Sequence, residues 1–195
     1  MRKISILTIT SGILLAISTL GFSVAPLFFD RPLIELQDSI DSLNKLAQEV
    51  WEDQLKALTH YENVRVLRDH TDILKSINAD TKLIDRMEKE LVLGLRTTTI
   101  SAIGVTLEAK VITEQQLNEA ISEVNKLNSH DELGPIFIKY LSMSGQGWEK
   151  LKRSIELEKR EYRNLLNSKN LWTICSIVIQ TIGLFLGLVN ISFKK

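Results

Sequence analysis

The sequence contains one cysteine, three prolines and nine glycines in 195 residues, and two long stretches of it contain no charged residue. A single thiol cannot form an intramolecular disulfide, which excludes a disulfide-stapled secreted module. Residues 4–29 and 170–193 are the uncharged stretches, and all 24 acidic residues lie between them. Because 20 of the 24 basic residues also lie there, positions 30–169 carry a net charge of −4. This pattern argues against a soluble globular enzyme and against a basic nucleic-acid-binding domain, so we expect no nucleic-acid partner.

Both uncharged stretches are long enough to cross a lipid bilayer. The 26 residues of 4–29 and the 24 residues of 170–193 would form helices of about 39 and 36 Å, against a hydrocarbon core of about 30 Å. Trp172 occupies the position of an interfacial aromatic residue, and Lys194 and Lys195 can reach the opposite headgroups. We predict two transmembrane helices, the first an uncleaved signal anchor. A cleaved secretory signal is the alternative, but its apolar region is typically only about 7–15 residues long.

Basic residues at both ends of the chain predict the orientation. Residues 1–3 and 194–195 are expected to be cytoplasmic tails, which places residues 30–169 outside the cytoplasm. Seven lysines and arginines in 148–169 oppose this orientation, but the charges of loops longer than about 60 residues have little influence on it. We therefore expect a two-pass integral protein of a bacterial inner (plasma) membrane, with both termini cytoplasmic.

The predicted fold class is all-α: two transmembrane helices flanking an elongated antiparallel helical bundle, a helical hairpin with short distal helices. The stretch 97–107 is also uncharged but is too short to span, so we expect it to be buried in the bundle. The sequence signals predict an interruption at Asp30–Pro32 and then a long helix to Ile77 with a kink or break at 59–65. A helix opened by Asp80 and a short helix opened by a capping box at 113–116 are expected to follow. The last part should contain a turn at 134–135, a brief helix over 136–143, a flexible point at 145–147 and one helix over 148–190.

Small and polar residues recur at three- and four-residue steps in both predicted spans. In the second span they are Thr173, Ser176, Gln180, Gly183, Gly187 and Asn190, and in the first they are Ser5, Thr8, Gly12, Ala16, Thr19 and Ser23. In the second span, Ser176, Gly183 and Asn190 continue a series at intervals of seven that begins before the span, at Trp148, Ile155, Tyr162 and Lys169. Such residues gain nothing from lipid but allow helices to approach closely and to hydrogen-bond. We predict helix-packing or oligomerisation seams: the spans pack on each other, on copies in a homo-oligomer, or around a water-lined pore.

The sequence predicts no catalytic residue, cofactor site or metal site. The three histidines, His60, His70 and His130, lack the helical spacing of a metal pair. One local pattern, Arg65-x4-His70, is similar to the ribonuclease motif of helical HEPN domains. That resemblance implies phosphate stabilisation by the arginine and acid–base chemistry by the histidine, and it covers only six residues.

The layout of the chain, with two long helices that run into two spans, is similar to the ligand-sensing bundle of bacterial chemoreceptors. We therefore expect a noncatalytic sensor, scaffold or assembly subunit that acts through its helical domain and by oligomerisation. Its expected partners are the lipid bilayer, copies of itself and a second membrane or signalling protein. A membrane-permeabilising pore-forming effector is the alternative, and a membrane-tethered HEPN-like ribonuclease is a remote one.

Overall fold

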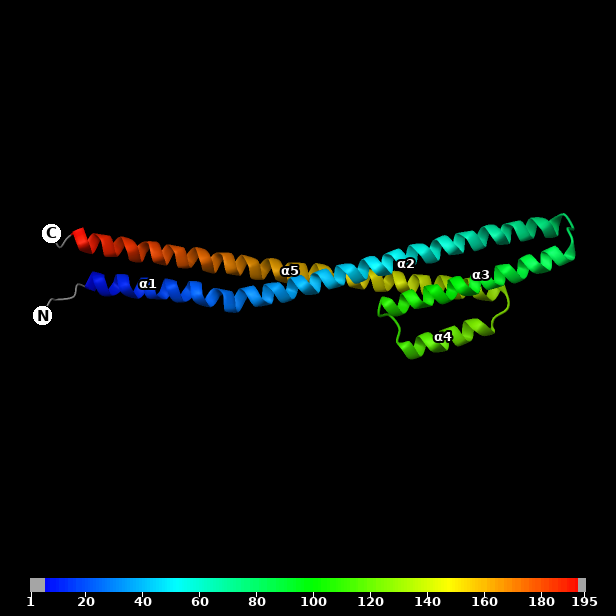
Figure 1. Ribbon diagram of the computed structural model, residues 1–195, viewed down its shortest axis with the longest axis horizontal. Coiled ribbons are helices and arrows are strands. Elements are labelled where there is room, and N and C mark those ends of the chain that lie inside the picture. Colours follow the sequence, from blue (N-terminus) through cyan, green and yellow to red (C-terminus); the bar gives the residue numbers. More distant parts are fainter. Residues whose placement is uncertain (1–5, 193–195) are drawn as a thin grey trace. The chain divides into compact units, whose positions relative to one another are not determined.

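The computed structural model describes residues 6–192, and every regular element in that range is helical, which confirms the predicted all-α class (Figure 1). The elements are α1 (Ile6–Ala25), a π-helical turn η1 (Pro26–Asp30), α2 (Arg31–Ser76), α3 (Thr81–Glu108), α4 (Glu114–Lys126) and α5 (His130–Ser192). The chain forms two compact units. The terminal unit contains the residues up to Asp41 and from Glu156 onward, and the central unit contains Ser42–Ile155.

The expected interruption at Asp30–Pro32 is absent, and that prediction is wrong. Ala25 and Arg31, on either side of η1, both have right-handed helical backbone, with φ/ψ of −52°/−44° and −63°/−50°. The chain therefore passes from α1 to α2 without leaving the helical conformation. A proline ring clashes with the preceding turn of an α-helix, and the wider π-turn that begins at Pro26 is a common way to relieve this clash.

Helix α2 also continues through 59–65, so the helix does not break at the predicted position. The apolar pattern weakens there, but Tyr61 and Val64 still pack against core clusters of the central unit. Tertiary contact thus supports a segment whose own periodicity is weak. The predicted stop after this helix is confirmed: α2 ends at Ser76, and the Asp80 side chain accepts a hydrogen bond of 2.9 Å from the Lys82 amide at the start of α3.

Helix α4 begins as predicted. The Thr113 hydroxyl accepts from the Gln116 amide, and the Gln116 side chain accepts from the Thr113 amide at 2.9 Å, so the capping box is complete. This reciprocal pair satisfies two amides that have no partner within the helix.

The predicted turn at 134–135 and the separate helix over 136–143 are wrong, because α5 is a single helix from His130. Pro135 costs one backbone hydrogen bond near the beginning of this helix. Gly134 has no Cβ to clash with the ring that follows it, and Leu133 and Phe137 on either side are fully buried. Burial of these two side chains keeps the segment helical through a residue pair that usually marks a turn.

The predicted flexible point at 145–147 is wrong as well, since these glycines lie inside α5. A Cβ added to Gly147 would lie 2.6 Å from Ala109 Cβ and 2.5 Å from Val111 Cγ2. The glycine therefore allows α5 to approach the chain at the end of α3 more closely than any side chain would permit.

Three buried clusters form the core of the central unit. The first is Ala47, Val50, Val105, Ala109, Leu151 and Ile155; the second is Leu95, Ile103, Ala120, Val124 and Leu133; the third is Ala57, Ala102 and Phe137. Two aromatic pairs pack beside them: Trp51 stacks on Trp148 with ring centroids 4.9 Å apart, and Tyr61 stacks on Phe137 at 4.4 Å. The uncharged stretch of α3 supplies several of these core residues, as expected for a helix buried in a bundle.

Candidate functional site

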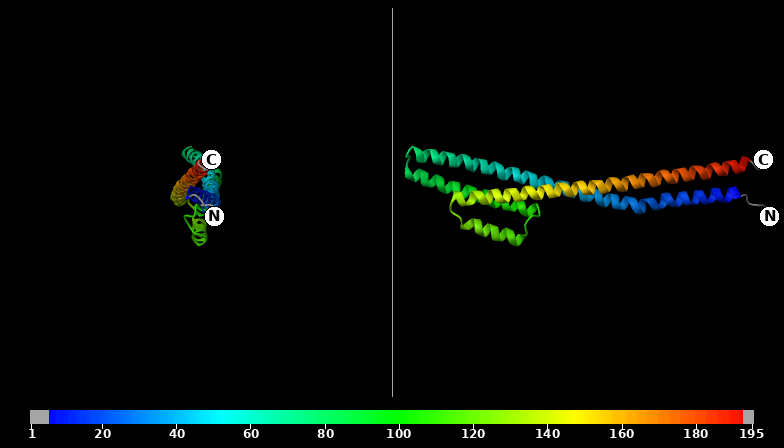
Figure 2. Two further views of the ribbon diagram at one scale, coloured as in Figure 1. Left: turned by 90° about the vertical axis from the view of Figure 1, so that its left-hand side faces the viewer. Right: turned by 180° about the vertical axis from the view of Figure 1, so that it is seen from behind.

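The uncharged parts of α1 and α5 run side by side in the terminal unit (Figures 1 and 2). The Ser11 hydroxyl donates a hydrogen bond of 2.6 Å to the Gly183 carbonyl, and the Ser18 hydroxyl donates one of 2.9 Å to the Ser176 carbonyl. An increase of seven along α1 matches a decrease of seven along α5, so the two helices are antiparallel. We call this contact the seam.

Small residues make the seam narrow. A Cβ on Gly21 would lie 2.7 Å from Ser176 Oγ, and one on Gly183 would lie 3.2 Å from Leu14 Cβ. A Cβ on Gly187 would come within 3.1 Å of Ser11 Oγ. Close backbone approach of this kind is typical of helix pairs in lipid, where packing and hydrogen bonds stabilise the contact.

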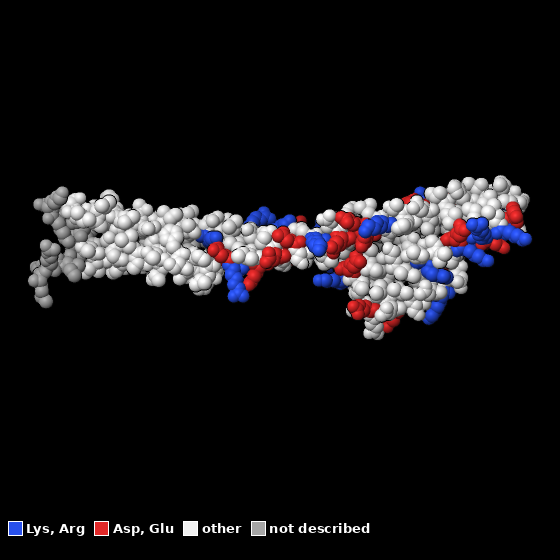
Figure 3. Space-filling view, viewed as in Figure 1, with Lys and Arg blue, Asp and Glu red and all other residues white. Residues whose placement is uncertain are grey.

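The seam ends at an ion pair. Lys169 Nζ lies 2.6 Å from Asp30 Oδ1, and the side chains are 34% and 41% exposed. One turn further into the uncharged part of α5, Trp172 Nε1 donates to the Gly21 carbonyl at 3.0 Å. Asp30 and Lys169 are the charged residues that border the two uncharged stretches. Among the described residues the helix pair therefore loses its charge at the same level on both helices, and the described part of this end carries neither blue nor red atoms on the face shown in Figure 3.

The predicted stripe of the second uncharged stretch lies mostly at the seam. Ser176 and Gly183 are buried there, and Thr173 and Gly187 are half-buried. Gln180 is exposed, and the side chain of Asn190 lies outside the described part of the structure. The heptad series before this stretch is buried to different degrees: Ile155 is buried, Trp148 and Tyr162 are half-buried, and Lys169 pairs with Asp30.

The stripe predicted in the first uncharged stretch does not face α5. The prediction that this stripe contacts the second span is therefore wrong. Ser5 lies outside the described residues, and the other members, Thr8, Gly12, Ala16, Thr19 and Ser23, are exposed. The contact uses a neighbouring face of α1, whose buried residues are Ser11, Ser18, Gly21 and Ala25.

The physical reason is that a hydroxyl on a helix does not need a partner helix. Thr19 donates to the Leu15 carbonyl at 2.8 Å, and Ser23 donates to the Thr19 carbonyl at 2.9 Å. A threonine or serine can therefore face lipid, and its presence alone does not mark the packed face. The sequence signal that was missed is the seven-residue spacing of Ser11, Ser18 and Ala25, with Gly21 between the last two.

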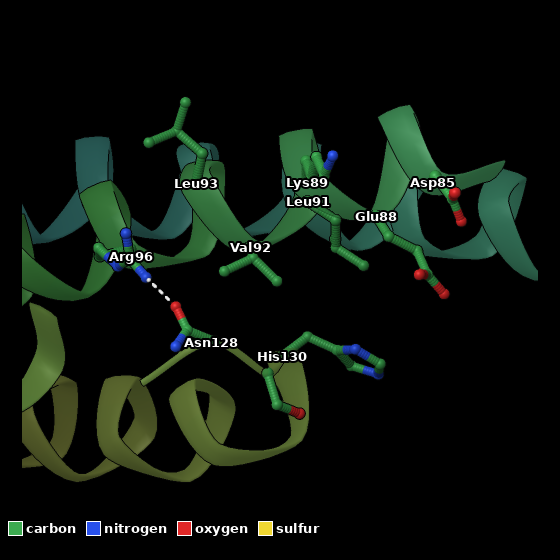
Figure 4. Close-up of a pocket in the computed structure, with 10 residues that line it drawn as sticks. Asp85, Glu88, Lys89, Leu91, Val92, Leu93, Arg96, Asn128 and His130 are labelled. Carbon is green, nitrogen blue, oxygen red and sulfur yellow. Dashed lines mark hydrogen bonds between the residues drawn. The ribbon is translucent and has the colours of Figure 1, made fainter. Parts of the chain in front are cut away.

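A separate hollow lies in the central unit, between α3 and the loop before α5. Its volume is about 600 Å³, and its charged lining residues have both signs: Asp85, Glu88, Lys89 and Arg96. Figure 4 shows Arg96 and Val92 of α3 facing the loop that carries Asn128. Arg96 Nη2 donates to the Leu127 carbonyl at 2.6 Å and to Asn128 Oδ1 at 3.1 Å. Because Leu127 is the C-cap residue of α4, this arginine acts mainly as a helix cap.

Two carboxyl groups lie together where α2 passes the end of α3. Burial raises the pKa of the Glu108 carboxyl above its usual range, and the nearby charge of Asp53 raises this pKa further. Lys56 Nζ lies 2.5 Å from Asp53 Oδ1, so the lysine partly neutralises the site. The arrangement favours a protonated Glu108 compared with an exposed glutamate.

The residues of the HEPN-like pattern are not brought into one cavity. Arg65 pairs with Glu62 at 3.1 Å and lines a small cavity with Tyr61 and Arg68, and His70 is not part of the lining of that cavity. Within residues 6–192 no group of three His, Cys, Asp or Glu side chains could hold a metal ion. Cys175 is exposed on α5.

Comparison of the chain with protein-family models, with curated proteins and with solved structures finds no match.

Proposed function

We propose that this protein is a two-span integral membrane protein whose spans are α1 and the last part of α5. In this proposal the central unit is a noncatalytic helical body held at the membrane, which acts as a sensor, scaffold or assembly subunit. The observation that carries the proposal is the seam: two uncharged helices pack antiparallel through small residues, and their first charged residues, Asp30 and Lys169, meet at its end.

The outward faces of the two helices support a lipid environment. Three helices of the described chain are long and apolar enough to cross a membrane: Ile6–Ser76, Thr81–Glu108 and His130–Val189. In the first and third, only 17% and 11% of the most apolar window is buried within the protein. Large apolar side chains such as Ile13, Leu20 and Phe185 are therefore exposed, and a surface of this kind is stable in lipid but not in water.

The second of these helices, α3, fits the bundle better than the membrane. The buried share of its apolar window is 44%, and its buried residues include Leu95, Ala102 and Ile103 of the core clusters. The Arg96 side chain reaches the end of α4 from the middle of this helix. We therefore assign α3 to the central unit and count two spans.

The seam favours an anchor over the pore alternative. Ser11 and Ser18 direct their hydroxyls to carbonyls of α5, so the polar groups of this α1 face are used in packing. The sensor or scaffold role is supported by α5, which is one helix from His130 to Ser192 and contributes to both units. A ligand or partner that displaces its first half can act on the span through continuous helical hydrogen bonds.

The native cysteine provides the test of the anchor. Cys175 is exposed on the helix pair, so in water it would react with a charged maleimide. We expect it to stay unlabelled in intact membranes and to react after solubilisation in denaturing detergent. As a matched control, a Glu132→Cys variant in a Cys175→Ser background should react with the charged reagent whenever the reagent reaches its side of the membrane, because Glu132 is exposed in the central unit. Rapid labelling of Cys175 in sealed vesicles would refute the two-span proposal.

A further inference from the structure

Gln180 is a polar residue at the centre of the proposed span. It lies 11 residues after Lys169, which corresponds to about 16 Å along the helix and hence to the middle of a hydrocarbon core of about 30 Å. This depth depends on the proposed function, because it assumes that α5 crosses the bilayer. Gln180 is exposed on α5, so in a single copy of the chain it faces lipid.

The Gln180 amide has no hydrogen-bond partner among the described residues, whereas the neighbouring hydroxyls do. Thr173 donates to the Lys169 carbonyl and Thr181 donates to the Ile177 carbonyl, each at 2.9 Å. A hydroxyl can thus be satisfied by its own helix. A primary amide has two N–H donors as well as a carbonyl acceptor, and leaving all of them unpaired in hydrocarbon is unfavourable.

The face around Gln180 permits another helix to approach. Thr173 and Gly187 lie seven residues before and after it, and both are small and only half-buried. Residues seven apart lie on one face of a packed helix, so the amide stands between two small residues. This face borders the seam, and a helix placed there would extend an interface that already exists.

We propose that the occupant of this face is the α5 helix of a second copy of this chain. In two copies inserted in the same direction, the two Gln180 side chains lie at the same depth. A symmetric contact then sets the donors of each amide opposite the acceptor of the other, so the group is self-complementary. The homodimer places an amide partner at mid-membrane, where lipid offers neither donor nor acceptor.

The test measures association of the full chain in lipid vesicles by energy transfer. Donor- and acceptor-labelled copies carry the dye at Glu132→Cys in the Cys175→Ser background, and the lipid-to-protein ratio is increased stepwise. We expect Gln180→Leu to weaken association about tenfold, the effect typical of a polar contact between membrane helices. Thr181→Val is the matched control, because that hydroxyl is satisfied within its own helix, and it should associate like the parent chain.

Two results would overturn the proposal: energy transfer that is unchanged in Gln180→Leu, or an equal loss in Thr181→Val. Absence of transfer in the parent chain at every lipid ratio would overturn it too. Failure of the anchor is recognised separately, by labelling of Cys175 in intact membranes. If Cys175 is protected but the copies do not associate, the two-span anchor is retained and the homodimer is refuted.

Discussion

Replacement of Gly147 by alanine tests the closest helix contact of the central unit. In most helices a Gly-to-Ala change is stabilising by about 0.5–1 kcal/mol, because alanine loses less backbone entropy on folding. At Gly147 the new Cβ would lie 2.6 Å from Ala109 Cβ and 3.2 Å from the Ala109 carbonyl oxygen. Neither atom belongs to a flexible side chain, so the backbone has to move.

The expected magnitude follows from these distances. Overpacking of a tight core typically costs about 1–3 kcal/mol, which exceeds the gain in helix propensity. Gly104 in α3 is the matched control, since a Cβ there would meet no atom within 4 Å. We expect Gly104→Ala to raise the free energy of unfolding and Gly147→Ala to lower it; the gain in helix propensity is common to both variants, so they should differ by the overpacking cost of about 1–3 kcal/mol.

The assay is thermal unfolding of the detergent-solubilised chain, followed by circular dichroism at a helix wavelength. The difference between the variants corresponds to several degrees in Tm for a domain of this size. If Gly147→Ala raised the Tm as much as Gly104→Ala, α5 would not approach the end of α3 as closely as the structure places it.

Three further predictions concern polar contacts. Ser144→Ala removes the acceptor of the buried Gln54 amide, a 2.8 Å bond, and should lower the free energy of unfolding in denaturant titration by about 1–3 kcal/mol; addition of Gln54→Leu should recover part of the loss. Asp30→Lys or Lys169→Asp alone should lower the Tm, and the double exchange should restore it, with a coupling of at most about 1 kcal/mol because the pair is partly exposed. The raised pKa of Glu108 means that its contribution to stability is present below its unfolded pKa and is lost as pH rises through its folded pKa. Glu108→Gln should therefore raise the unfolding free energy at pH 7 relative to the parent, and the two proteins should converge near pH 4; a gap that does not depend on pH would contradict this origin.

Local signals in the sequence predicted several features of the fold correctly. The all-α class, the end of α2, the Asp80 cap and the capping box at Thr113 all depend on hydrogen bonds or periodicities within a few residues. Short-range features of this kind can be read from the chain because the interacting atoms are close in sequence.

Interruptions of the helices were predicted less well, because whether a glycine or proline ends a helix depends on contacts with residues distant in sequence. Glycine and proline at 134–135 and 145–147 indicated a turn and a flexible point, yet both lie inside α5. Buried Leu133 and Phe137 hold the first segment, and the close approach of Ala109 explains the glycine at 147. A helix-breaking residue lowers only local propensity, and tertiary packing can exceed that cost.

The candidate site likewise contains some residues that the sequence predicted and others that only the structure shows. The heptad spacing in α5 indicated Ser176 and Gly183, which the structure places at the seam. In α1 the stripe of small residues indicated a face that does not meet α5, because Thr19 and Ser23 satisfy their own hydroxyls and give no sign of which side packs on that helix. The partnership of Ser11 with Gly183 joins atoms 172 positions apart and could only come from the structure.

The amino-acid sequence by itself determined where charge stops and where helices can form, since both follow from side-chain chemistry and local backbone energetics. Only the tertiary structure decided which face of α1 meets α5, that Asp30 meets Lys169, and that Gln180 has no hydrogen-bond partner within residues 6–192. The physical reason is that one helix offers several faces of similar composition. The choice among them depends on how closely two backbones can approach, which is a property of the pair of helices together.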